Sequence, residues 1–151
     1  MGNSITEGWV NTHPDFFKSN GYIGRSIGGQ TSYQFLVRFR EDVINLSPAL
    51  VVINAATNDI AENTGAYHED RTFGNIVSMV ELAKANHIKV ILTTTLPAAA
   101  FGWNPSIKDA PQKIQSLNAR IEAYAKANKI PFVNYYQPMV VGENKALNPQ
   151  Y

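Results

Sequence analysis

The chain has no cysteine in its 151 residues. This absence excludes disulfide scaffolds, thiolate metal sites and cysteine nucleophiles, and it leaves the cellular compartment open. An excess of charge is also lacking, because thirteen basic and twelve acidic side chains leave a formal net charge of +1. The charge balance therefore gives no reason to expect a nucleic acid or an anionic membrane as a partner. Long apolar runs are absent too, so the sequence predicts no transmembrane segment.

Short apolar runs rich in β-branched residues alternate with segments in which apolar residues recur at helical spacing. The runs predict parallel strands buried on both faces, and the spacing predicts helices between them. This alternation favours one α/β domain over residues 1–151, built as a three-layer α/β/α sandwich around a mostly parallel sheet. The predicted strands cover residues 49–55, 88–94 and 130–134, and the predicted helices include residues 35–43, 73–80 and 114–124.

Three loops carry the residue types that acyl-transfer chemistry requires. In an open parallel sheet, ligands bind at the carboxyl ends of the strands. Ser4 is a small hydroxyl residue that follows Gly2-Asn3 and precedes a stretch able to become helical, which is typical of a nucleophile at a strand-to-helix turn. Gly29 offers a backbone N–H that a ligand can approach closely, and the side-chain amide of Asn58 offers a second donor. A nucleophile and such donors, together with a base, make up an acyl-transfer site.

Three sequence blocks, in this order, resemble the first three blocks of the SGNH hydrolases, also called the GDSL lipase/esterase family. They are Gly2–Thr6, Gly28–Ser32 and Thr57–Ile60, and the resemblance covers nearly the whole chain. It implies a flavodoxin-like parallel sheet and a serine esterase that works through an acyl-enzyme. In that family's terms Ser4 is the nucleophile. The N–H groups of Ser4 and Gly29 and the amide of Asn58 form the oxyanion hole.

The resemblance also implies what the protein acts on and where. Family members hydrolyse carboxylic esters, thioesters or acetyl groups on sugars and lipids, and they need no metal or other cofactor. The implied partner is a small-molecule ester, namely an acylated or acetylated sugar or lipid. Many bacterial relatives are exported, so a periplasmic or secreted location is expected by analogy. The sequence sets no oligomeric state.

Three departures from the family pattern stand out. Asn3 replaces the usual aspartate and should keep its turn and cap hydrogen bonds, whereas Ala56 replaces a common glycine and adds a methyl group close to the oxyanion hole. The Asp-x-x-His block that supplies the family's base has no counterpart, and none of His13, His68 and His87 matches it. We therefore expect an internal portion of a longer domain, lacking its first strand and its C-terminal segment. The alternative is a non-catalytic SGNH-like module that binds a ligand or acts as a scaffold.

A second serine competes with Ser4 for the role of nucleophile. The segment Gly24-Arg25-Ser26-Ile27-Gly28 fits the G-x-S-x-G turn of the α/β-hydrolases. That fold needs a histidine late in the sequence, and the last histidine here is His87. Ser26 is therefore the weaker candidate, and we expect it to belong to the loop that presents Gly29.

Four further residues have two interpretations each. Asp59 is either a carboxylate base or a cap, the usual role of an aspartate at a loop-to-helix transition. Trp9, Phe101 and Trp103 either line a substrate groove, because aromatic rings stack on sugars and acyl chains, or pack in the core or a lid.

Overall fold

The computed structural model describes all residues 1–151 and has a parallel sheet at its centre. Its strands β1 (Leu50–Ile53), β2 (Lys89–Thr93) and β3 (Phe132–Val133) lie in the order β1-β2-β3. Val51 pairs with Val90, and Leu92 pairs with Phe132. The predicted α/β fold with a parallel sheet is confirmed, although each strand is shorter than the apolar run that predicted it.

The remaining elements connect the strands or follow the last one. They are α1 (Ser4–Thr12), α2 (Pro14–Ser19), α3 (Ser32–Phe39), the π-helical turn η1 (Arg40–Ile44), α4 (Thr57–Ile60), α5 (Glu69–Ala85), α6 (Ala110–Ala127), α7 (Tyr136–Met139), and the antiparallel pair β4 (Val140–Val141) and β5 (Ala146–Leu147). No helix combines the length and apolar character that a membrane span requires.

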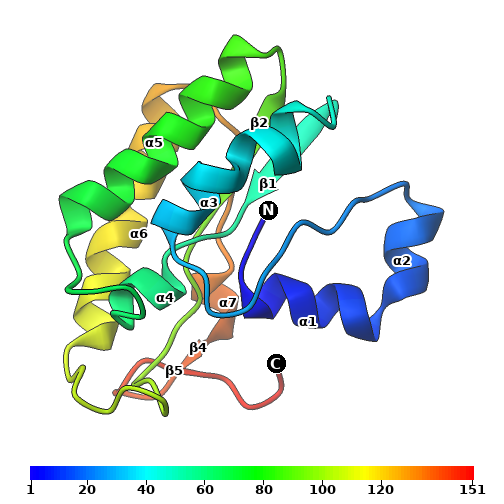
Figure 1. Ribbon diagram of the computed structural model, residues 1–151. Helices are drawn as coiled ribbons and strands as arrows, with labels where there is room; N and C mark the ends of the chain where they lie inside the picture. Colours follow the sequence, from blue (N-terminus) through cyan, green and yellow to red (C-terminus); the bar gives the residue numbers. More distant parts are fainter.

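One face of the sheet carries the hydrophobic core. Helices α3, α5 and α6 lie on the same side of the strands (Figure 1), and their inward residues form one buried cluster with Val51, Ile53, Val90 and Leu92. Because the apolar residues of these helices recur every three or four positions, each helix turns a continuous stripe toward the strands. The core therefore fixes the sheet against a single helix layer.

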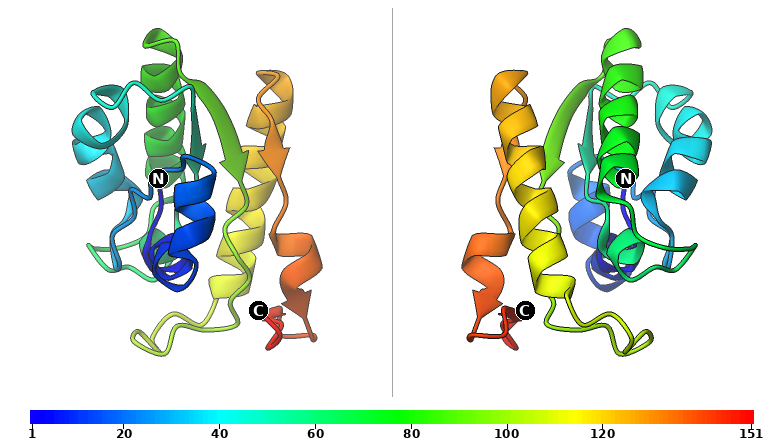
Figure 2. Two further views of the ribbon diagram at one scale, coloured as in Figure 1. Left: turned by 90° about the vertical axis from the view of Figure 1, so that its right-hand side faces the viewer. Right: turned by 90° about the vertical axis from the view of Figure 1, so that its left-hand side faces the viewer.

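The opposite face is less covered than the sequence predicts. Helices α1 and α2 lie on this side, and in the left view of Figure 2 α5 and α6 are behind the strands while β2 and β3 remain in view. Leu50 is 40% exposed and Val52 is 38% exposed, so the expectation of strands buried on both faces is wrong for β1. The physical reason is that α1 packs on α2, where the ring of Trp9 lies 5.4 Å from that of Phe16, and α1 has no buried residue.

Met1 and Gly2 pair with the sheet directly ahead of Ser4. The Met1 amino group donates to the Val52 carbonyl at 3.0 Å, and the Asn54 N–H donates to the Met1 carbonyl at 3.1 Å. On its other side Gly2 exchanges backbone hydrogen bonds with residues 25–27, in a parallel bridge. Ser4 therefore follows two residues with the hydrogen-bond pattern of a parallel strand, which places it at the carboxyl edge of the sheet.

Candidate active site

Ser4 is exposed and is the first residue of α1. Asn3 caps the helix, because its side-chain oxygen accepts from the Ile5 N–H at 3.1 Å, and the asparagine is only 1% exposed. Asparagine thus performs the capping that was expected of it in place of aspartate. The Ser4 N–H has no hydrogen-bond partner in the protein and lies at the positive end of the helix dipole.

The Gly28–Gly29 loop packs directly against Ser4. A β-carbon added to Gly28 would lie 3.6 Å from the Ser4 β-carbon and 2.9 Å from a carboxylate oxygen of Glu7, so a larger residue here would displace the Glu7 side chain. The same Glu7 oxygen accepts from the Gly28 N–H at 2.9 Å, which holds the loop to α1. Gly29 has a φ of +74°, a conformation that favours glycine, and its N–H has no partner in the protein.

Asn58 joins this loop from the other side. It lies in α4, is 3% exposed, and donates through Nδ2 to the Gln30 carbonyl at 2.9 Å. Because a side-chain amide has two N–H hydrogens, one remains to act as a donor. Gly28 is bonded to Glu7 in the helix that Ser4 begins, and Asn58 is bonded to the residue after Gly29. The structure thus gathers all three predicted residues around one loop, and Figure 1 shows the starts of α1 and α4 at the same end of the sheet.

Ala56 occupies the turn that leads into Asn58. Its φ is +85°, in the left-handed region, and it is 2% exposed. This backbone conformation explains why a glycine is common at the position, since glycine adopts it without steric cost. Alanine in place of glycine therefore strains the backbone here, and its methyl group also takes up space near the oxyanion hole.

Asp59 is a cap, but for a neighbouring helix. Its carboxylate accepts from the N–H of Ser32 at 2.9 Å, from the Ser32 hydroxyl, and from the Thr72 hydroxyl at 3.2 Å. Ser32 is the first residue of α3, so the carboxylate binds a helix-terminal N–H that would otherwise have no partner. Burial raises the pKa of this carboxyl, against the opposing effect of the hydrogen bonds from Ser32 and Thr72. No contact links Asp59 to Ser4.

None of the three histidines is hydrogen-bonded to Ser4. His13 is the C-cap of α1, at the opposite end of that helix from Ser4, and its Nδ1 lies 2.9 Å from the Thr12 hydroxyl. His68 is exposed and precedes α5. His87 lines a hollow at the amino ends of the strands, the opposite edge of the sheet from Ser4. The structure brings none of them to the nucleophile.

The remaining candidate residues from the sequence, one serine and three aromatic residues, differ in how far they are exposed to solvent. The Ser26 hydroxyl is buried and has no hydrogen-bond partner, in a segment that pairs with Gly2 and does not lead directly into a helix. Phe101 is 2% exposed and belongs to the core, whereas Trp9 and Trp103 are 46% and 62% exposed. Ser26 is therefore closed to a substrate, and of the three aromatic residues only the two tryptophans present a ring to solvent.

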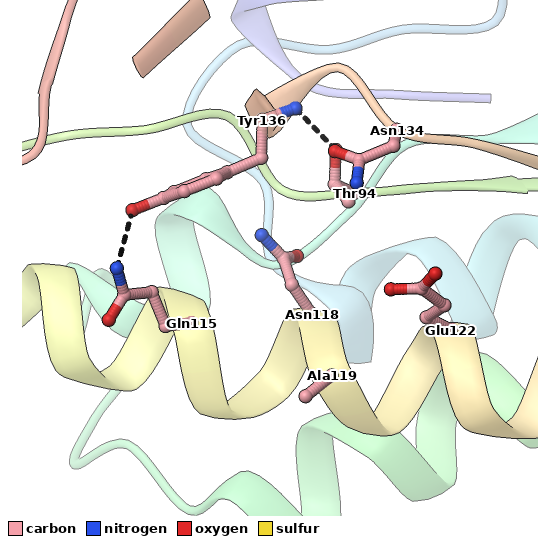
Figure 3. A pocket seen from close by; sticks show the side chains of 7 residues that line it. All are labelled: Thr94, Gln115, Asn118, Ala119, Glu122, Asn134 and Tyr136. Atoms are coloured by element: carbon pink, nitrogen blue, oxygen red, sulfur yellow. Dashed lines mark hydrogen bonds between the residues drawn. The ribbon is translucent and has the colours of Figure 1, made fainter. Parts of the chain in front are cut away.

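Sequence reasoning missed two features of this edge of the sheet. One is Asn63, whose side chain bonds both Gly29 and Trp103; nothing in the sequence pattern singles it out. The other is a polar cavity of about 170 Å³ beside α6, in which the Tyr136 N–H donates to the Thr94 hydroxyl and Gln115 donates to the Tyr136 hydroxyl (Figure 3). It is lined by Thr94, Gln115, Asn118, Ala119, Glu122, Asn134 and Tyr136. The run of threonines at the end of β2 was its only signal.

Known proteins resemble the chain over its whole length. The sequence pattern of the GDSL-like lipase/acylhydrolase family matches residues 1–150. The chain belongs to this family. The resemblance that the three sequence blocks predict is thus confirmed, and with it the SGNH type of fold.

Solved structures of GDSL-family proteins support the same assignment. An acylhydrolase-family protein from Bacteroides fragilis is 92% identical with a TM-score of 0.99, and a GDSL-like lipase from Bacteroides thetaiotaomicron is 87% identical with a TM-score of 0.99. The match covers all of this chain and 73% and 74% of theirs. An acetyl xylan esterase that is 21% identical shares the fold with a TM-score of 0.73, over 91% of this chain and 76% of its own.

A curated relative of this GDSL-family chain is the uncharacterized lipoprotein YqeF of Bacillus subtilis. The two are 32% identical over 93 residues, which make up 59% of this chain and 38% of the lipoprotein. The matched region therefore spans well under half of that relative's length.

Proposed function

We propose that this GDSL-family chain is a serine-dependent carboxylic ester hydrolase that acts on acylated or acetylated sugars or lipids. The observation that carries the proposal is the loop of Gly28 and Gly29, which is held to the Ser4 helix by the hydrogen bond from Gly28 to Glu7 and to Asn58 through Gln30. A hydroxyl, two unpartnered N–H groups and a free amide hydrogen thus come from three neighbouring loops.

In the proposed reaction the Ser4 Oγ attacks the ester carbonyl carbon while its proton passes to a general base. The carbonyl oxygen becomes an oxyanion that accepts hydrogen bonds from the N–H groups of Ser4 and Gly29 and from the Asn58 amide. The C–O bond to the alcohol then breaks, the alcohol leaves with a proton, and water hydrolyses the acyl-Ser4 ester. We assign the base to none of His13, His68 and His87, since none of them is hydrogen-bonded to Ser4 and none matches the family's Asp-x-x-His block.

The test compares two serine variants of the full chain. Ser4→Ala should abolish labelling by a fluorophosphonate and the serine-dependent hydrolysis of p-nitrophenyl acetate, because both need the Ser4 hydroxyl. Ser26→Ala is the matched control and should keep both, because the Ser26 hydroxyl is buried. Labelling that survives Ser4→Ala and vanishes in Ser26→Ala would show that the nucleophile is the other serine.

A non-catalytic binding module is the second candidate, favoured by the lack of a base hydrogen-bonded to Ser4. It predicts that the ester is recovered intact after long incubation with the full chain and that no acyl group is transferred to Ser4. Mass spectrometry of the protein and of the ester decides between the two.

We also propose that the protein is exported, to the periplasm or outside the cell. The similarity to a Bacillus subtilis lipoprotein supports this location. Fractionation of the native organism followed by immunoblotting tests it, and a signal confined to the cytoplasmic fraction would contradict it.

A further inference from the structure

Trp103 is a highly exposed aromatic residue that the structure nevertheless holds in place. It is 62% exposed, and its indole N–H donates to the side-chain oxygen of Asn63 at 2.8 Å. Its ring packs on the buried Phe101, with 5.2 Å between ring centroids. The next residue, Asn104, donates to the Ala61 carbonyl at 2.9 Å and so fastens the loop to the segment after α4. The indole is therefore held by one hydrogen bond and one ring contact while most of the residue is open to solvent.

Asn63 connects this indole to the proposed oxyanion hole. The same amide that accepts from Trp103 donates through Nδ2 to the Gly29 carbonyl at 3.0 Å. The backbone N–H of Asn63 donates to the Asn58 carbonyl at 3.0 Å. Three hydrogen bonds of one residue thus link Trp103 to Gly29 and Asn58, the residues proposed to hold the reacting carbonyl oxygen.

The surroundings of the ring suit a sugar better than a hydrocarbon chain. A long acyl chain needs an enclosed apolar groove, whereas a sugar ring uses one aromatic surface for its C–H face together with polar groups for its hydroxyls. The side chains bonded in this loop cluster are amides and hydroxyls, namely Asn63, Asn104 and Ser106. Phe101, on which the indole packs, is buried and offers a ligand no surface of its own.

We propose that Trp103 is a substrate-binding residue that stacks on the sugar ring whose acyl group Ser4 attacks, and that Asn63 is the residue that positions it. This inference rests on the proposed function, and it assigns the substrate to the esters of carbohydrates. Trp9 is not part of this proposed sugar-binding surface, because it packs with Phe16 and Phe17 on α2 and makes no hydrogen bond to the loops around Ser4.

A binding experiment tests the contact between Trp103 and the sugar without hydrolysis of the ester. The chain has two tryptophans, so Trp9→Phe leaves Trp103 as the sole indole and Trp103→Phe leaves Trp9. Both are prepared with Ser4→Ala and titrated with acetylated xylo-oligosaccharides. The Trp103 fluorescence should change saturably, and the Trp9 fluorescence should not. A response from Trp9 alone, or from neither up to millimolar ligand, overturns the inference whether or not the protein hydrolyses esters.

Kinetics separate this inference from the proposed function. Trp103→Ala should raise KM for an acetylated xylo-oligosaccharide about tenfold or more, and it should leave the hydrolysis of ethyl acetate, which has no ring to stack, within about threefold. Trp9→Ala is the control and should change neither. Equal losses on both esters, or a loss confined to a long-chain ester such as vinyl decanoate, would contradict the assignment to sugars. Whether Ser4→Ala abolishes hydrolysis tests the proposed function and has no bearing on the role of Trp103.

Two substitutions of Asn63 test its positioning role. Asn63→Asp keeps the oxygen that accepts from Trp103 and loses the donor to Gly29, so KM for the sugar ester should stay near wild type while kcat falls on both esters. Asn63→Ala loses both bonds and should raise KM for the sugar ester as well. If the two variants have the same KM, Asn63 does not position Trp103.

Discussion

Asn58 illustrates how a buried polar residue can be held in place and still have a donor to spare. Burying an amide without hydrogen bonds is costly, so a residue only 3% exposed needs partners. The bond from its Nδ2 to the Gln30 carbonyl provides one partner and fixes the rotamer, while the second amide hydrogen has no acceptor in the protein. A donor fixed before the substrate arrives costs little reorganisation when charge develops on the carbonyl oxygen.

We predict that Asn58→Ala lowers kcat for an ester substrate by about 10² to 10³, since loss of one oxyanion donor has that effect in serine hydrolases. KM should change little, because the donor acts mainly on the transition state. Asn86→Ala removes an exposed amide at the end of α5 and serves as the control. An unchanged kcat in a folded Asn58→Ala protein would remove Asn58 from the oxyanion hole.

At the scale of elements, Asp59 joins three helices. It lies in α4, binds the first N–H of α3, and accepts from Thr72 in α5. Replacing it by alanine leaves buried donors without acceptors, at a cost of about 1 to 3 kcal/mol for each unsatisfied group. The position of α3 relative to α4, and with it the loop that leads to Gly29, depends on this carboxylate.

The raised pKa of Asp59 predicts a pH dependence of stability. Because burial raises the pKa in the folded state, the folded protein binds more protons than the unfolded chain between the ordinary pKa of an aspartate and the raised value. Stability from this group is therefore lost as the pH rises through that window. Urea denaturation at several pH values should show wild type losing stability relative to Asp59→Asn as the pH rises. The opposite slope would mean that the hydrogen bonds from Ser32 and Thr72 outweigh burial.

The elements differ in how far the sequence predicts them. The β-branched runs around Val51 and Val90 predict the strands because a buried parallel strand is apolar at every position. The sequence offers either a cap or a carboxylate base for Asp59 and cannot identify the helix that it caps, because its partners Ser32 and Thr72 are 27 and 13 residues away. Local patterns determine that a residue caps, and only the packing of the helices determines which helix receives the cap.

The candidate site shows the same division. Ser4, Gly29 and Asn58 lie in short blocks that a family pattern identifies, so the sequence alone selects them. Asn63 carries no such pattern, and its importance comes from one amide that reaches two separate loops. The exposure of Trp103 and the burial of Phe101 could not be predicted either, because two aromatic residues two positions apart look alike until the loop conformation is known.

At the scale of the whole molecule, the two faces of the sheet differ in how they are covered. Helices α3, α5 and α6 cover the face that includes Val51, whereas α1 and α2 lie on the side of Val52 and pack mainly on each other (Figure 1). Val51 is 6% exposed and Val52 is 38% exposed, although they are neighbours in the same strand. Burial of apolar area contributes to stability in proportion to the area removed from water, so these two side chains should contribute unequally.

We predict that Val51→Ala lowers the free energy of unfolding by about 2 to 3 kcal/mol, the sum of lost burial and a residual cavity, and that Val52→Ala lowers it by about 1 kcal/mol or less. The pair is its own control, because both changes replace valine by alanine in β1 and lose the same intrinsic preference for a strand. Urea denaturation of both variants at pH 7 provides the measurement. Equal losses would show that the Val52 face is as well covered as the Val51 face, and the sheet would then be packed on both sides as its apolar sequence predicts.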